Sequence, residues 1–332
     1  MVSLPPEPRP THDVDAPAVV PVMTETGGLL ADGVGVAADD IDTPVARRRS
    51  GRMRLLAKRF ARNKPAVVGV VIFVLLVALA CFGEFATSYS YTDVDFAAIG
   101  LPPGPDHWFG TNDAGNDLYA QVVHGLGRSL IIAVTVSLAT TVIAGFIGAI
   151  AAYFGGLVQR VILGVIYLLL VVPTFLILAL ISSKTGGSWV WLIVVFIAVG
   201  WMMLARIVYS MAQTITSRDF VSAARYLGER PIVIIARHIL PNLASLLVIN
   251  FALGVVATVL SETGLSFLGL GVKIPDVSLG ALLQSGAGTL SSSPWLFYFP
   301  AATLVLLTVS MALIADGLRD ALDPTSSAGG HA

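Results

Sequence analysis

The 332-residue chain is poor in charged residues and has almost no cysteine. Only 12% of its residues are charged, about half the share of roughly 25% that is usual in soluble domains. So few ionic groups cannot cover a globular surface in water, which excludes a soluble globular protein. The single cysteine, Cys81, excludes an intrachain disulfide framework and a cysteine-based metal cluster. The net charge of -1 argues against nucleic-acid binding as the main function.

Apolar residues dominate the chain: 55% of its residues are hydrophobic, and the mean hydropathy is +0.82. A helix needs about 20 apolar residues to cross a hydrocarbon layer of about 30 Å. Six segments without Lys or Arg meet this requirement, at about 66–85, 129–154, 161–183, 187–205, 240–261 and 296–315. The sequence therefore predicts an all-α polytopic membrane protein with six transmembrane helices. Pro173 and Pro300 should kink the third and sixth helices.

Basic residues are distributed unevenly between the two sides of these segments. If the N-terminus is cytoplasmic, sixteen Lys and Arg residues fall on the cytoplasmic side, and only Arg128, Lys184 and Lys273 fall on the other. Cytoplasmic loops carry the excess of Lys and Arg in membrane proteins. The asymmetry predicts cytoplasmic termini and supports the count of six spans.

The flanks of the apolar region differ in composition from its core. Residues 1–46 are rich in proline and acids, which is typical of a disordered tail, and they lack the features of a signal peptide. Residues 47–65 are basic and are expected to lie on the anionic lipid surface as a partly amphipathic helix. These segments precede a transmembrane domain over 66–324, and a short tail follows over 325–332.

The predicted spans contain small residues for packing but no charged relay. Gly145, Gly148 and Ala149 belong to a stripe that lets helix backbones approach closely in lipid. Transporters driven by ion gradients place acids, His or Lys within the membrane, whereas here the acid nearest to a span interior is Glu262. We infer that the energy source is another protein. Glu262 is a candidate contact at a pore mouth, and a structural hydrogen bond is an equally good interpretation.

A polar segment between the fourth and fifth spans has the pattern of a short helix. Ser217 is expected to be its N-cap and Gly228 its C′ residue. Its apolar face is formed by Phe220, Ala223, Ala224 and Leu227. Because the rest of the chain is committed to lipid, we expect this face to dock into a groove on a soluble partner. Three arginines are placed to pair with acids at the rim of that groove: Arg218, Arg225 and Arg230.

This segment resembles the EAA loop of bacterial ABC importer permeases, whose pattern is E-A-A-x3-G-x9-I-x-L-P. The matching residues are Ser222-Ala223-Ala224, Gly228 and Leu240-Pro241, within an EAA-like loop over 217–242. Ser222 stands where the family has Glu, and His238 stands where it has Ile. The stretch 237–242 reads Arg-His-Ile-Leu-Pro-Asn, which is common in the peptide and nickel branch of the family.

Three further stretches are similar to the dipeptide and oligopeptide permeases of that branch. Residues 107–117 are similar to the H-P-F-G-T-D-x-x-G-R-D element, with Asn112 and Asn116 as departures. Residues 262–271 are similar to a segment that contains L-S-F-L-G-L-G, and residues 315–324 match the C-terminal G-D-x-L-R-D-x-L-D-P. The stretches stand in the family's order, and the resemblance covers roughly residues 55–324.

The resemblance implies a transport subunit that is not itself an enzyme. The family works in the bacterial cytoplasmic membrane as two homologous permeases with two ATP-binding subunits and an extracytoplasmic binding protein. The chain has no Gly-x4-Gly-Lys-Ser/Thr phosphate loop, so its partners would hydrolyse ATP, and no cofactor or metal site is expected. The expected interface with the ATPase consists of Arg218, Phe220, Ser222, Ala223, Ala224, Arg225, Leu227 and Gly228.

The substrate is specified least by the sequence. Branches of the family carry dipeptides, longer peptides, glutathione or nickel, and the absence of a His or Met cluster on the outer side favours a peptide. Two other classes make different predictions. A secondary transporter acting alone would need charged residues within the membrane, and a scaffold without transport activity would need no docking helix.

Overall fold

The computed structural model describes residue 54 and residues 56–322 apart from residue 185. The predicted tails, 1–46 and 325–332, and part of the basic segment lie outside these residues. Every named element of the described chain is a helix. Five helices are long and apolar enough to cross a membrane, or six if one bent pair counts as a single span. The all-α class is confirmed, and the count of six agrees with the bent pair taken as one span.

The spans are longer than the apolar segments that predict them. They are α2 (Lys64–Phe82, continued by η1, Gly83–Ala86), α3 (Leu118–Phe154), α6 (Trp189–Thr216), α9 (Ala244–Phe267) and α11 (Trp295–Leu322). The shorter elements are α7 (Asp219–Tyr226), α8 (Pro231–Ile234), the π-helical turn η2 (Ile235–Ile239), η3 (Leu240–Asn242) and α10 (Leu279–Gly288). The helix α3 begins eleven residues before the predicted span, because Asp117 caps it by accepting a hydrogen bond from the N–H of Ala120.

The third predicted span is broken. It consists of α4 (Gly156–Val171) and α5 (Thr174–Lys184), which bend by 71° at the break. Pro173 lies in the break, where its missing N–H and its ring prevent a continuous helix. The kink predicted there is confirmed. By contrast, α11 runs through Pro300 as a single helix.

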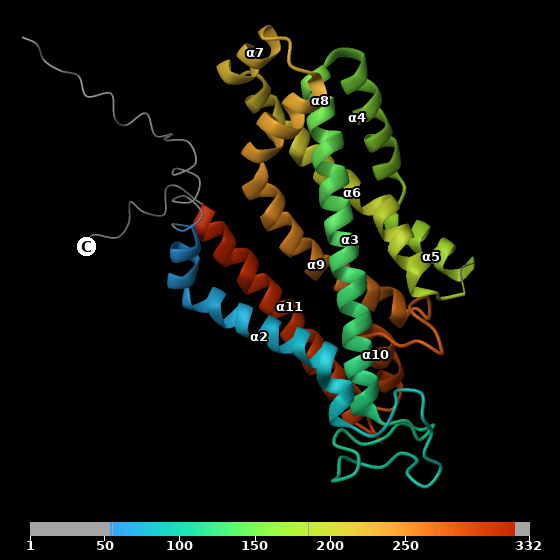
Figure 1. Ribbon diagram of the computed structural model, residues 1–332. Helices are drawn as coiled ribbons and strands as arrows, with labels where there is room; N and C mark the ends of the chain where they lie inside the picture. The colour runs from blue at the N-terminus through green and yellow to red at the C-terminus, as the bar shows by residue number, and fades with distance from the viewer. Residues whose placement is uncertain (1–53, 55, 185, 323–332) are drawn as a thin grey trace, which may run out of the picture. The chain divides into compact units, whose positions relative to one another are not determined.

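The central element is α3, which packs against α2, α4, α6, α9 and α10 (Figure 1). Its small residues allow a close approach to α6. A Cβ atom at Gly148 would lie 2.6 Å from the carbonyl oxygen of Ala205 in α6, so the two backbones are nearly in contact. The packing role predicted for the small-residue stripe is therefore confirmed at this crossing.

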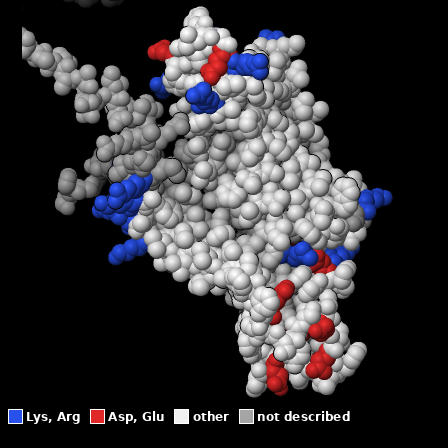
Figure 2. Space-filling model, in the orientation of Figure 1, with Lys and Arg blue, Asp and Glu red and all other residues white. Residues whose placement is uncertain are grey.

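Two regions outside the long helices lie at opposite ends of α3 (Figure 1). At one end stand α7 and α8. At the other, residues 87–117 form a lobe without regular helix or strand, which we call the acidic lobe. It carries five Asp residues and no Lys or Arg, and Figure 2 shows acidic side chains on it. This lobe adjoins α10 and the α9–α10 connection.

Candidate functional site

The short helix expected in the 217–242 loop is present as α7, although its first cap differs from the prediction. Arg218 occupies the N-cap position, while Ser217 is the C-cap of α6 and its Oγ donates to the carbonyl of Thr214 (3.0 Å). The predicted N-cap is therefore wrong, because the preceding helix continues further than its apolar run.

Gly228 ends α7 as predicted. It has a φ of +76°, and its N–H donates to the carbonyl of Arg225 (3.1 Å). The next N–H, of Glu229, donates to the carbonyl of Ala224 (3.1 Å). These two bonds form a Schellman motif, whose left-handed residue is usually glycine. Gly228 is confirmed as the C′ residue, and it reverses the chain so that α8 can pack beneath α7.

One side of α7 is covered and the other is not. Val221 and Ala224 are buried against Ile234 of α8. The expectation that the chain offers α7 no internal cover is thus wrong for Ala224, because α8 folds back under it. On the other side, Phe220 is 44% exposed, Leu227 is 87% exposed and Ala223 is exposed as well. Three of the four residues of the predicted apolar face therefore remain accessible.

The polar residues of the predicted interface are less uniform. The Arg225 guanidinium lies over the ring of Tyr153, 4.7 Å from its centroid, which holds Arg225 by a cation–π contact within the chain. Arg218 and Arg230 are exposed and form no ion pair among the described residues. Ser222, which replaces the family's Glu, is half-buried. All three arginines are thus exposed, but only Arg225 is held by a contact within the described chain.

The second half of the loop anchors α7 to the bundle. Ile234, Ile235 and Ile239 are fully buried, and the last two pack against residues of α3 and α6. His238 Nε2 donates to Glu229 Oε2 (3.0 Å), which ties η2 to the turn after α7. The family's loop pattern leaves these three positions unspecified. Their apolar pattern was the signal that they form the buried foot of the loop.

Glu262 lies near the other end of the molecule, in α9, and its side chain is only 1% exposed. Its Oε1 accepts hydrogen bonds from Ser266 Oγ (2.8 Å) and Ser278 Oγ (2.6 Å). Ser278 is the N-cap of α10, so this carboxylate joins α9 to α10. A pore-mouth contact needs an accessible side chain, whereas Glu262 is buried in the described structure. The structural interpretation is the one that the geometry supports.

The motif at 107–117 builds the acidic lobe. Gly110 and Gly115 have φ values of +79° and +81°, which favour glycine. Asn112 Oδ1 accepts the N–H groups of Ala114 and Asn116, both at 2.9 Å. The Nδ2 of Asn116 donates to the carbonyl of Asp93 (2.9 Å). The two asparagines that depart from the family pattern are therefore turn-forming and bracing residues here.

A polar cluster connects α3 to the α9–α10 connection. Asp276 Oδ1 accepts hydrogen bonds from His124 Nε2 (2.8 Å) and Arg128 Nε (2.9 Å). Arg128 also lies over the ring of Trp189, 4.6 Å from its centroid, which brings in the start of α6. Desolvation would raise the pKa of Asp276, but the hydrogen bonds and charges of His124 and Arg128 outweigh it and lower this pKa below its ordinary value. Local sequence patterns do not reveal this cluster, because Asp276 is some 150 residues from His124 and Arg128.

These features define a polytopic helical membrane protein with an anchored, partly uncovered short helix at one end and a hydrogen-bonded polar lobe at the other. Two known protein families match this chain. Residues 144–327 match the model of the binding-protein-dependent transport system inner membrane component, and residues 51–103 match that of the N-terminal TM domain of oligopeptide transport permease C. The chain belongs to this family of transport permeases.

Named peptide permeases are similar to this chain over most of its length. The oligopeptide transport system permease protein OppC of Mycobacterium tuberculosis (strain H37Rv) is 44% identical over 279 residues, which are 83% of this chain and 96% of that protein. The dipeptide transport system permease protein DppC of Bacillus subtilis is 32% identical over 268 residues, 80% of this chain and 84% of that protein. The OppC protein of the same organism is 31% identical over 266 residues, 80% and 87% of the two chains.

Proposed function

We propose that this chain is a permease subunit of an ATP-driven ABC importer of peptides, that it forms half of the pore, and that α7 is its coupling helix. The observation that carries the proposal is the two-sided environment of α7. Val221 and Ala224 fasten this helix to the bundle, while Phe220 and Leu227 remain exposed. A hydrophobic surface on a fixed support is what a soluble partner needs in order to push on the membrane helices.

The connections of α7 explain how a push would reach the pore. α7 follows α6 after two residues, and α8, η2 and η3 lead from it directly into α9. A partner that closes on α7 would therefore move α6 and α9 with it, and the pore would change between inward-facing and outward-facing states. A change in the ratio of states from 1:99 to 99:1 requires about 5.5 kcal/mol of differential binding. ATP binding by the partner would supply this free energy, and the chain itself needs no cofactor.

The proposed assembly contains this chain, a homologous second permease, two ATP-binding subunits and an extracytoplasmic binding protein. The family's description as binding-protein-dependent supports the last of these. The assembly would lie in a bacterial cytoplasmic membrane. Both termini would be cytoplasmic, for which the support is the excess of sixteen Lys and Arg over three. In this orientation α7 faces the ATPases and the acidic lobe faces the binding protein.

The proposed substrates are dipeptides and oligopeptides. The support is that the relatives are named as oligopeptide and dipeptide permeases and that each of them matches at least 80% of this chain. Nickel and glutathione, which related branches carry, are the alternatives that a transport assay must separate from peptides.

The decisive experiment is uptake by proteoliposomes that contain the full complex, loaded with ATP and supplied with the binding protein. We expect a labelled tripeptide to accumulate, and nickel and glutathione to remain outside. A Phe220→Ala/Leu227→Ala double variant should lose most of the co-purifying ATPase and most of the uptake. Leu290→Ala, which shortens an exposed leucine at the other end of the molecule, is the matched control and should retain the ATPase.

Two results would contradict the proposal. Accumulation of peptide by vesicles that contain only this chain, without an ATPase, would identify a secondary transporter. Full retention of the ATPase by the double variant would show that α7 is not the docking surface.

A further inference from the structure

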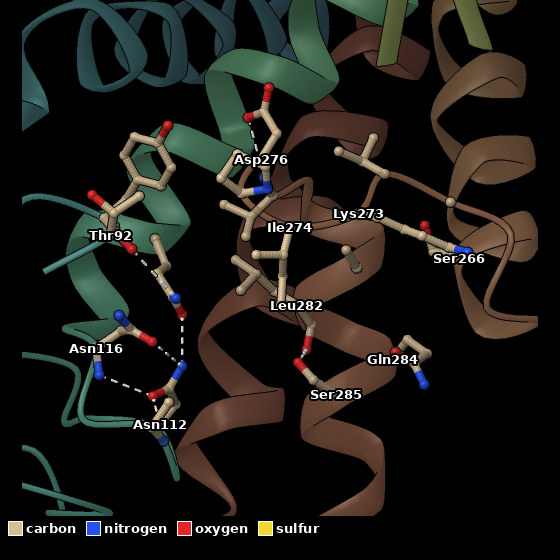
Figure 3. Close-up of a pocket in the computed structure, with 18 of the residues that line it drawn as sticks. Thr92, Asn112, Asn116, Ser266, Lys273, Ile274, Asp276, Leu282, Gln284 and Ser285 are labelled. Atoms are coloured by element: carbon tan, nitrogen blue, oxygen red, sulfur yellow. Dashed lines mark hydrogen bonds between the residues drawn. The ribbon is translucent and has the colours of Figure 1, made fainter. Parts of the chain in front are cut away.

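A cavity of about 880 Å³ lies between the acidic lobe and α10. The lobe forms one wall, α10 forms the opposite wall, and the α9–α10 connection closes one side (Figure 3). The cavity is open at its rim, where Ile274 is 92% exposed. Its size is within the range of about 300–1,000 Å³ that is typical of small-ligand sites.

The wall formed by the acidic lobe and the start of α3 carries a chain of side-chain amides. Asn112 Nδ2 donates to Asn116 Oδ1 (3.2 Å) and to Gln121 Oε1 (3.3 Å), as the dashed lines in Figure 3 show. The oxygen of Asn112 is held by two backbone N–H groups, so the chain of amides has a fixed orientation. Asn116 donates one of its two N–H bonds to Asp93, which leaves the other directed to no described partner.

The opposite wall carries polar side chains that form fewer hydrogen bonds within the described chain. Gln284 is exposed, and its amide forms no hydrogen bond among the described residues. Ser285 donates to the carbonyl of Leu282 (3.0 Å) and keeps its acceptor capacity. Figure 3 shows both on the α10 side, across from Asn112 and Asn116. The cavity therefore has hydrogen-bonding groups on both walls, separated by apolar side chains such as Leu282.

The charges of the lining narrow the class of ligand. Among the described residues that line the cavity, Lys273 is the only Lys or Arg, and Asp276 is the only acid and is already paired with His124 and Arg128. A phosphate-rich ligand would need more cations. The described residues contain no group of three or more His, Cys, Asp or Glu side chains that could hold a metal ion. A ligand with alternating donors and acceptors and little charge suits this lining best.

We propose that this cavity is a binding site for the extended backbone of a short peptide on its way to the pore. The amides of Asn116 and Gln284 pair with peptide N–H and C=O groups, the apolar wall accommodates side chains of varied type, and Lys273 attracts the terminal carboxylate. Recognition of the backbone alone explains how one site accepts many sequences. This inference rests on the proposed function, because it assumes that peptides reach this face of the subunit.

The test is photolabelling of the full complex in proteoliposomes with the tripeptide Ala-photoleucine-Ala, followed by mass spectrometry. We expect adducts on segments 87–121 and 266–285. Gln284→Leu and Ser285→Leu should each lower the yield of these adducts about fivefold to tenfold, because a hydrogen bond is lost and the site is narrowed. Ser292→Leu is the matched control. Ser292 also donates to the carbonyl three residues earlier but does not line the cavity, so its yield should equal that of the wild type.

Uptake of the same tripeptide, measured in parallel, separates this inference from the proposed function. Normal uptake with adducts confined to other segments, or with no loss of adducts in either variant, would overturn the site and leave the function intact. Adducts in the cavity without any uptake would support the site and overturn the importer. A p-benzoylphenylalanine at position 284 that cross-links to the binding protein in place of peptide would show that a protein segment fills the cavity, and would also overturn the inference.

Discussion

The acidic lobe and the 217–242 loop both connect membrane-length helices, yet different interactions fasten them. Side chains that bond the backbone brace the lobe and the neighbouring α9–α10 connection, as Asn112 and Asn116 do, and Glu262 joins α9 to α10. The 217–242 loop relies on apolar contacts, chiefly Val221 and Ala224 on Ile234 and the isoleucines of η2 on α3 and α6. The lobe is therefore a frame braced by hydrogen bonds, and we expect the loop to act as a lever that an apolar foot fastens to the bundle.

The largest expected effect comes from removing Glu262, which joins α9 to α10 beside the acidic lobe. Glu262→Ala should lower the free energy of unfolding by about 3 kcal/mol, because it leaves the buried hydroxyls of Ser266 and Ser278 without their acceptor. Thermal unfolding in detergent measures this loss. Glu262→Gln keeps an acceptor oxygen and should retain most of the stability. An alanine variant that melts with the wild type would show that the carboxylate is not a brace.

A second substitution tests the apolar foot of the lever. Val221→Ala removes two buried methyl groups from the contact with Ile234 and should destabilise the docking of α7 by about 1.5 kcal/mol. Hydrogen exchange of the amides of residues 219–226 should accelerate, with little change in the acidic lobe. Leu227→Ala is the control, since its 87% exposed side chain contributes little to this contact. Equal acceleration in both variants would contradict the assignment of the two faces.

A third substitution tests the turn that positions the lever. Gly228→Val forces a β-branched residue into a φ of +76° at a cost of about 1 kcal/mol, whereas Gly228→Asn fits the left-handed region better. Among the described residues, no atom outside the turn would touch the new Cβ, so the effect is one of backbone strain. We expect the complex that contains the valine variant to take up less peptide per ATP hydrolysed by its ATPase subunits, and the complex with the asparagine variant to remain coupled. Unaltered coupling in the valine variant would count against the role of α7.

The smallest expected effect is a loss of thermal stability at low pH through Asp276. Because Asp276 has a lowered pKa in the folded protein, its interactions stabilise the fold fully above the unfolded value of about 3.9 and are lost as the pH falls through the folded value. The unfolding temperature should therefore fall below about pH 4 more steeply in the wild type than in Asp276→Asn, which lacks this titration. Parallel pH profiles of the two unfolding temperatures would show that Asp276 does not cause the loss of stability in acid.

Several parts of this structure could be predicted from local sequence. The apolar runs located the spans, Pro173 marked the broken one, and Gly228 marked the end of α7, because each effect acts within a few residues along the chain. The limits of the helices could not be found in this way. Arg128 interrupts the apolar pattern of α3, yet the helix starts at Leu118, since the cap at Asp117 and the packing of the following turns hold it together. The wrong prediction of Ser217 as the N-cap of α7 has the same cause, because the apolar run of α6 ends before the helix does.

The sequence alone determined that this protein lies in a membrane, where its apolar spans fall, and that a short helix lies between the fourth and fifth of them, because hydropathy and capping are properties of single segments. Only the tertiary structure decided which residues of that helix face inward, that Glu262 is a buried brace, and that amides distant in the sequence line one cavity. These outcomes depend on which helices pack against each other. That packing is fixed by the fit of side chains from remote segments, as at Gly148 against α6 and Val221 against α8.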